Sequence, residues 1–229
     1  MNHGEWIGSN IHESNRMLIL GESHYGDENG TNESMGKPVP YTTEGVVRAY
    51  KEHKIPGNSK ARWDKFFDQM AACFGYPKGK GGDFYDEVFF GNYVPVLCGI
   101  AKENRAEHYM KANRTEYNNQ LFEFINNHGI DTVVCFSIAT FWNLPATADS
   151  DRDTYNEIEL PLIGGRRNII YYYSYSPFVS HGYCDINLEK PLKVYGIRHP
   201  SAQGGFNAEA VYEVFSHVDD LMTYIYAGG

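Results

Sequence analysis

Short apolar runs and helical patterns alternate along the chain. Runs with the length and the β-branched or aromatic content of strands cover residues 17–20, 85–96, 132–136, 169–175 and 192–197. Apolar residues recur at helical spacing over residues 43–53, 61–74, 114–127 and 208–226. Strands that alternate with helices predict a largely parallel sheet with helices on both faces. Because no repeat or linker interrupts the pattern, we expect one α/β domain over residues 1–229.

Polar residues cluster where three of the expected strands end. The first cluster is Gly21-Glu22-Ser23-His24-Tyr25-Gly26, predicted as a turn; the second is Asn92; the third is His199-Pro200-Ser201. A long segment rich in Gly, Asn and Pro follows the first cluster, from residue 27 to 41, and is typical of a functional loop. Ligands of parallel α/β sheets bind beyond the carboxyl ends of the strands. These clusters are therefore the candidate site.

The net charge of −9 excludes a polycation that coats nucleic acid without specificity. The four cysteines are spaced too widely for a CxxC zinc or iron–sulfur site, so we expect buried, reduced thiols and no metal or organic cofactor. No run approaches the roughly 20 apolar residues of a membrane span. We expect a cytoplasmic monomer without membrane contact.

The first cluster does not match two common catalytic turns. A serine-hydrolase elbow needs glycine two residues on either side of the serine, and Tyr25 stands at the second of these positions. A phosphate loop is also excluded, because no Gly-Lys-Ser/Thr follows.

In order and spacing, the three clusters resemble the motifs of the uracil-DNA glycosylase superfamily. The resemblance covers the chain from Met17 to the C-terminal helical segment, and His199-Pro200-Ser201 after the last strand is its most specific part. It implies a three-layer α/β/α fold with a central, mostly parallel four-stranded sheet. It also implies a monofunctional DNA glycosylase that acts on a flipped-out base in DNA.

The resemblance assigns roles to individual residues. His199 would hydrogen-bond the base carbonyl and stabilise the departing base, and Asn92 would read the Watson–Crick edge. Tyr25 would crowd C5 of the ring. Ser23, two positions before it, would also contact the substrate. After Ser201, the loop 202–206 would enter the space that the base vacates. Gln203 or Phe206 would form its tip.

One position departs from the uracil-specific pattern. The third residue of the first motif, where that branch has a water-activating Asp, is Ser23. Glu22, Asp27 and Glu28 are the alternative catalytic carboxylates. The expected substrate is therefore uracil or another modified pyrimidine, and one version of the function is the removal of hypermodified bases from phage DNA.

The chemistry of the reaction agrees with these residue types. Cleavage of an N-glycosidic bond builds positive charge on the sugar and negative charge on the base, which calls for a carboxylate and a hydrogen-bond donor. A flipped base also needs an aromatic partner, for which the candidates are Tyr41, Trp63, Phe66 and Tyr93. The tyrosines at 171–173 and 175 instead indicate a half-buried strand.

Binding of DNA by an acidic protein requires that its few cations gather on one face. The candidate phosphate contacts, in duplex or single-stranded DNA, are Lys78, Lys80, Arg166, Arg167 and Arg198. Two other functions remain open. One is a catalytically silent nucleic-acid-binding protein or DNA mimic of the same fold, and the other is a hydrolase that uses Ser23 with His24 or His199.

Overall fold

The protein is an α/β structure built on one mixed sheet. The computed structural model describes residues 4–25, 43–52, 62–99, 105–145, 155–163, 166–202 and 205–228. Within these ranges the strands are β1 (Trp6–Ile7), β2 (Met17–Tyr25), β3 (Phe89–Cys98), β4 (Thr132–Cys135), β5 (Asn156–Ile163), β6 (Arg166–Tyr175) and β7 (Leu192–Gly196). The helices are α1 (Thr43–Lys51), α2 (Arg62–Ala72), α3 (Gly81–Glu87), α4 (Ala106–Ala112), α5 (Arg114–His128), α6 (Ile138–Asn143), α7 (Ala208–Phe215) and α8 (Asp219–Met222).

The seven described strands run in the order β1-β3-β2-β4-β7-β6-β5. The four central strands β3, β2, β4 and β7 are parallel to one another, whereas β1, β6 and β5 join through antiparallel pairs. The expectation of a four-stranded, mostly parallel sheet is therefore wrong in size and in the share of parallel pairs. It holds only for the central strands; of the outer strands, the sequence predicted β6, as the run at 169–175, but not β1 or β5.

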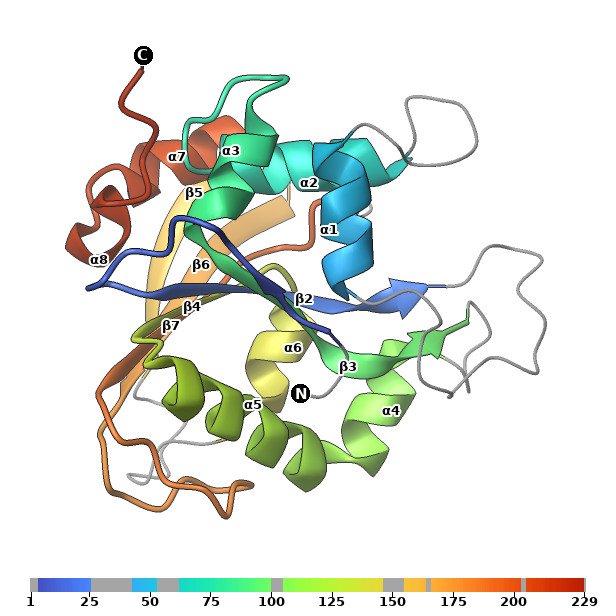
Figure 1. The fold of residues 1–229 in the computed structure, drawn as a ribbon, viewed down its shortest axis with the longest axis vertical. Helices are drawn as coiled ribbons and strands as arrows, with labels where there is room; N and C mark the ends of the chain where they lie inside the picture. Colours follow the sequence, from blue (N-terminus) through green and yellow to red (C-terminus); the bar gives the residue numbers. More distant parts are fainter. Residues whose placement is uncertain are drawn as a thin grey trace.

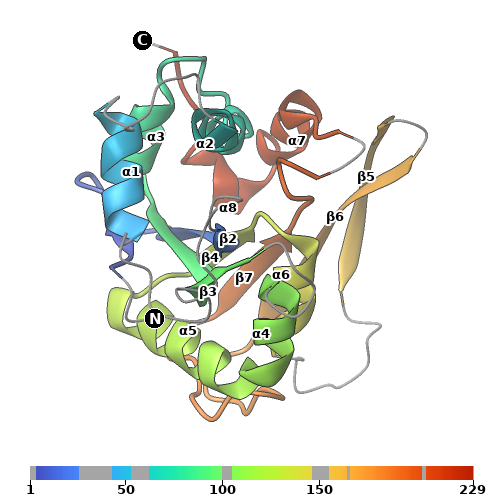
Figure 2. The ribbon, with the colours of Figure 1, turned by 90° about the vertical axis from the view of Figure 1, so that its right-hand side faces the viewer.

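Helices cover both faces of the sheet, as expected from the alternating pattern (Figures 1 and 2). On one face, α1, α2, α3, α7 and α8 pack on alternate residues of β2, including Met17 and Ile19. On the other face, α4, α5 and α6 pack on Leu18 and Leu20. The run at 17–20 is therefore buried on both sides, which is why it is apolar throughout.

Several expected boundaries change in the structure. Residues 21–25 are not a turn but the continuation of β2, and Asn92 lies within β3 rather than at its end. The residues from 85 to 87 belong to α3 rather than to the strand expected over 85–96. The predicted helix over 208–226 divides into α7 and α8, because Val218 between them is extended.

The expected helices at 43–53, 61–74 and 114–127 are confirmed as α1, α2 and α5 within one or two residues. Gly129, at φ 60°, ends α5 in the left-handed region, which glycine adopts without strain. All four cysteines are free and buried. Among the described residues, no helix is long and apolar enough to cross a membrane.

Candidate functional site

The candidate site begins where two strands, β2 and β3, extend beyond the ends of their neighbours β4 and β7. Leu20 of β2 lies level with Cys135, the last residue of β4, and Cys135 is in turn level with Gly196, the last residue of β7. Beyond this line β2 continues alongside β3 only. The β2–β3 ribbon therefore projects past the carboxyl edge of the central sheet (Figures 1 and 2). Ligands of parallel α/β sheets bind beyond this edge.

The first two sequence motifs meet in this ribbon. Gly21 pairs directly with Asn92 in the parallel ladder. A Cβ atom at position 21 would lie 2.4 Å from Oδ1 of Asn92, so the amide occupies the space that the glycine leaves. Asn92 is 8% exposed. Position 21 is glycine because the Asn92 side chain folds over it.

Glu22 is held by two hydroxyl donors. The Tyr25 hydroxyl donates to Oε1 at 2.6 Å, and the Ser137 hydroxyl donates to Oε2 at 2.7 Å. Burial, and then the charge of Glu22, raises the pKa of Tyr25 well above its usual range, which keeps the phenol a donor. Both carboxylate oxygens are thus held in place by hydrogen bonds.

Ser137 was not among the site residues predicted from the sequence. It follows β4 and caps α6, where its Oγ accepts a hydrogen bond from the backbone N–H of Thr140 at 3.2 Å. A serine that follows a buried strand and precedes a short apolar segment is a helix N-cap signal, and that signal could have identified it. One side chain therefore ties the end of β4, the start of α6 and the Glu22 carboxylate together.

His199 follows β7 and packs against α2. Its ring stacks on Phe66, with the ring centres 5.1 Å apart and an interplanar angle of 26°. The backbone N–H of Ser201 donates to Nδ1 at 3.1 Å, and the Ser201 hydroxyl lies 3.0 Å from the same atom. Burial lowers the pKa of His199, while the charge of Glu22 opposes that shift. The third motif thus lies within electrostatic reach of the first.

These contacts determine the tautomer of His199. A backbone N–H can only donate, so Nδ1 must accept and carries no proton. A neutral imidazole then carries its proton on Nε2. His199 is accordingly a neutral hydrogen-bond donor.

A second histidine, His24, lies against Asn92. Nε2 of His24 is 2.9 Å from Nδ2 of Asn92 and 3.1 Å from Oγ1 of Thr43, the first residue of α1. Burial lowers the pKa of His24 from 6.5 to about 4, so the ring is neutral at pH 7.

Ser23 shows no catalytic pairing. Its hydroxyl oxygen is buried and has no hydrogen-bond partner among the described residues. His24 and His199 both contact other groups, namely Asn92 and Ser201. Within the described part of the chain, Ser23 therefore forms no hydrogen bond with His24 or His199, which the hydrolase alternative requires.

The aromatic candidates differ in availability. Tyr93 is buried and donates its hydroxyl to Asn118 Oδ1 at 2.9 Å, so it belongs to the core. Phe66 covers His199, as described above. Tyr41 and the side chain of Trp63 lie outside the described residues.

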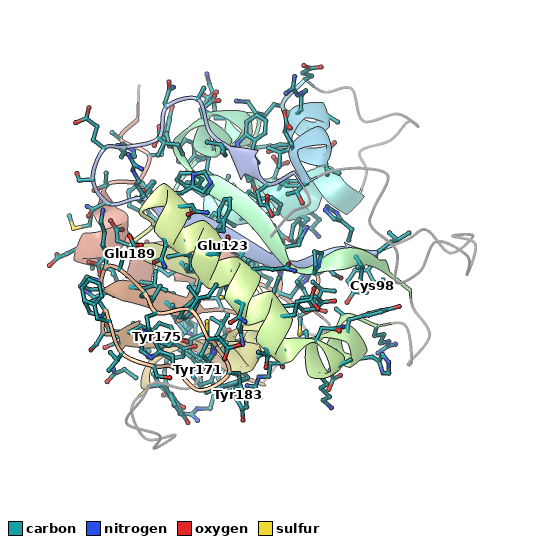
Figure 3. All side chains as sticks on the ribbon, turned by 60° about the horizontal axis from the view of Figure 1, so that its bottom comes forward. Cys98, Glu123, Tyr171, Tyr175, Tyr183 and Glu189 are labelled. Atoms are coloured by element: carbon teal, nitrogen blue, oxygen red, sulfur yellow. The ribbon has the colours of Figure 1, made fainter. Side chains whose placement is uncertain are left out.

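The tyrosine-rich strand β6 is half-buried, as its sequence indicated. Figure 3 shows Tyr171 and Tyr175 well apart from Cys98, which ends β3 beside the tip of β2. Tyr175 donates to the backbone oxygen of Pro145 at 2.7 Å. This strand is therefore part of the core, away from the projecting end of the β2–β3 ribbon.

The remaining predicted site residues are placed only in part. Ser201 is exposed beside His199, whereas Phe206, just before α7, is partly buried against the core and so is not a free loop tip. Asp27, Glu28 and Gln203 lie outside the described residues.

Two of the five candidate DNA-contacting cations are paired with carboxylates. Lys80 pairs with Asp83 at 3.7 Å, and Arg167 bridges Glu157 at 2.9 Å and Glu159 at 2.8 Å across β5 and β6. Further cations include Lys78, which is exposed in the loop before α3, and Arg198, which directly precedes His199; the side chain of Arg166 lies outside the described residues.

The chain matches no known family model and no curated protein. The geometry of the site therefore carries the functional argument.

Proposed function

We propose that the protein is a monofunctional DNA glycosylase that hydrolyses the N-glycosidic bond of a flipped-out uracil or modified pyrimidine. One observation carries this proposal. Three segments far apart in the sequence bring Glu22, Asn92 and a neutral His199 to the same edge of the sheet. A carboxylate, an amide and a neutral donor are the groups that the reaction needs.

His199 supplies the donor for the leaving base. As the N-glycosidic bond breaks, negative charge develops on the base and spreads to its carbonyl oxygens. The Nε2–H of a neutral imidazole can donate to such an oxygen without a prior change of protonation. Ser201 holds the ring in this tautomer and Phe66 shields one of its faces.

Glu22 supplies the negative charge for the sugar. Positive charge develops on the sugar ring, and a fixed carboxylate stabilises it electrostatically or orients the attacking water. Tyr25 and Ser137 hold both oxygens of Glu22, so the carboxylate does not need to reorganise during the reaction. In this proposal Glu22 supplies the carboxylate that the uracil-specific branch has at the position of Ser23, which a serine cannot supply.

The test is an excision assay with a panel of oligonucleotides. Duplex and single-stranded DNA would carry uracil, thymine, cytosine and hypermodified pyrimidines, and abasic sites would be detected by alkaline cleavage. Loss of one preorganised donor costs on the order of a hundredfold to a thousandfold in rate, which is the expected effect of His199→Ala. The excision rate of the Glu22→Gln variant is expected to fall at least as far, because the substitution removes the negative charge of the carboxylate.

His217→Ala is the matched control, because His217 is exposed just beyond the C-terminal end of α7 and contacts Glu213 and Ser216 of its own segment. It should retain full activity. The proposal fails if no base yields an abasic product, or if His199→Ala is as active as the original protein.

A binding protein without catalytic activity, or a DNA mimic, is the second candidate. The −9 net charge and the pairing of Arg167 and Lys80 with carboxylates favour it. It predicts no excision of any base and a binding partner whose affinity is unchanged in Glu22→Gln and His199→Ala. The glycosylase of the first proposal would act in the cytoplasm on cellular or phage DNA. The oligonucleotides that carry hypermodified pyrimidines test phage DNA as its substrate.

A further inference from the structure

An exposed group of aromatic side chains is built around α6, and the candidate site does not use it. Trp142 is 43% exposed, although its ring packs edge to face on Tyr155 and on the half-buried Tyr171, with 5.0 Å between the ring centres in each pair. The rings of Tyr155 and Tyr171 also contact each other, at 5.6 Å. These three rings, which we call the Trp142 cluster, hold one another in place. The exposed surface of Trp142 is therefore fixed before any ligand binds.

The Trp142 cluster lies close to the candidate site. Ser137, the N-cap of α6, donates to Glu22, and Trp142 follows it by five residues, about 7.5 Å along the helix axis. Tyr171 of the cluster pairs with Gly196, the last residue of β7. The cluster is therefore level with the line at which the central strands end, on the face of the sheet that α4, α5 and α6 cover (Figure 2).

One cation is fixed beside the cluster. Arg114, the first residue of α5, donates from Nη2 to the backbone oxygen of Trp142 at 2.8 Å and from Nε to that of Asn143 at 3.1 Å. Its guanidinium also lies over the ring of Tyr183, 3.9 Å from the ring centre. Among the described residues no carboxylate pairs with Arg114. It therefore presents a positive charge in a fixed position, and a guanidinium is well suited to bind phosphate.

We propose that Arg114 and the Trp142 cluster form a binding subsite for single-stranded DNA, in which an unpaired base stacks on Trp142 and a phosphate of the same strand contacts Arg114. This inference rests on the proposed function, which supplies DNA as the ligand at this edge of the sheet. The subsite binds a nucleotide beside the flipped one. It makes single-stranded DNA the preferred substrate.

The aromatic surface favours an unpaired strand over a duplex. Inside a duplex the faces of the bases are covered by their stacked neighbours, so a flat aromatic side chain finds no free face to contact. In a single strand every base has a free face, and aromatic side chains with a nearby arginine bind such strands whatever their sequence. Trp142 and Arg114 together provide this combination.

The charges next to the cluster permit a polyanion to bind. Glu157 of β5 is directly opposite Tyr171 in the β5–β6 pair. Arg167 binds both Glu157 and Glu159. Much of the negative charge that β5 places beside the cluster is thus offset, and Arg114 adds a positive charge near Trp142.

Binding of undamaged oligonucleotides tests the subsite without requiring catalysis. Fluorescence anisotropy would measure the affinity for a single-stranded oligothymidylate and for a duplex of the same length. Trp142→Ala removes one base stack and should lower the affinity for the single strand about fivefold or more, with the duplex affinity unchanged. Trp142→Tyr keeps a ring and should retain most of the affinity. Phe178→Ala is the matched control, because Phe178 is 74% exposed in the loop after β6, at the opposite edge of the sheet.

The salt dependence of binding tests Arg114 separately. Each phosphate contact with a single strand contributes about 0.7 to the slope of log affinity against log salt concentration. Arg114→Gln should therefore reduce this slope by about 0.7, whereas Trp142→Ala should leave it unchanged. Arg48→Gln is the control, since Arg48 is an exposed arginine of α1 on the other face of the sheet.

Three results would overturn the subsite. The first is a Trp142→Ala protein, folded by circular dichroism, that binds the single strand as tightly as the original protein. The second is an equal loss of affinity for the duplex, and the third is an original protein that binds no single-stranded DNA. The excision assay separates these results from the proposed function. Excision with unchanged binding by Trp142→Ala removes only the subsite, and binding through Trp142 without excision of any base removes only the glycosylase.

Discussion

At the scale of single residues, the site depends on the absence of a side chain at Gly21. Gly21→Ala would place a methyl group 2.4 Å from Oδ1 of Asn92, so the amide must move. We expect excision to fall about tenfold or more, with a loss of about 1–3 kcal/mol in the free energy of unfolding from local overpacking. Excision kinetics and urea unfolding measure the two effects. Full activity in the Gly21→Ala variant would show that the amide position does not matter.

Ser137 makes a separate prediction, because its hydroxyl serves both a helix and the carboxylate. Ser137→Ala removes the N-cap of α6 and one donor to Glu22, and should lower the free energy of unfolding by about 1 kcal/mol. The excision rate should fall about tenfold as Glu22 loses its fixed orientation. Ser137→Thr keeps the hydroxyl and should restore both quantities. Equal activity of the Ala and Thr variants would contradict the role in catalysis.

These residues show what the sequence could and could not predict of the site. Glu22, Asn92 and His199 were identifiable because each interrupts or follows an apolar run with a reactive side chain. Ser137 and His24 contact site residues that lie 115 and 68 positions away in the chain. Such long-range contacts leave no local pattern, so only the fold reveals them.

At the scale of elements, the predicted turn was wrong over residues 21–25 for a physical reason. Residues 22–25 are polar because the β2–β3 ribbon extends beyond the buried part of the sheet, and not because the strand ends. β5 escaped detection because it is an edge strand containing Pro161, a residue that central strands exclude. Hydrophobic pattern therefore reports burial, and it reports strand length only where the strand is buried.

The helices α1, α2 and α3 meet at two adjacent glycines, Gly81 and Gly82. Their replacement by alanine should change the stability of the protein in opposite directions. A Cβ at Gly81 would lie 2.2 Å from the Tyr50 hydroxyl, which donates to Asp68 at 2.5 Å, so Gly81→Ala should destabilise the protein by about 1–3 kcal/mol. At Gly82 the nearest atom is 3.7 Å away, and Gly82→Ala should add up to about 1 kcal/mol of helix stability. Thermal unfolding of both variants decides this. Equal effects would mean that Tyr50 moves away freely.

At the scale of the whole molecule, the sequence predicted layers better than it predicted the extent of the sheet. The alternation of Met17 and Ile19 with Leu18 and Leu20 divides the core into two clusters, each covered by its own helices. Antiparallel strands at both edges were beyond reach, because their pairing partners are set by neighbours rather than by local composition. The carboxyl edge of the four parallel strands was predictable, and the candidate site lies there.

The whole molecule should also lose stability in acid through His24. Its folded pKa of about 4 lies below the unfolded value of 6.5, so between these values the unfolded chain binds the extra proton. The stabilisation is present above pH 6.5 and is lost as the pH falls toward 4, at a cost of about 2 kcal/mol by pH 5. Urea unfolding at pH 7.5 and pH 5 should therefore show a smaller acid loss in His24→Gln than in the original protein. An equal loss in both would mean that His24 titrates normally, and that its ring is not enclosed with Asn92 and Thr43 in solution.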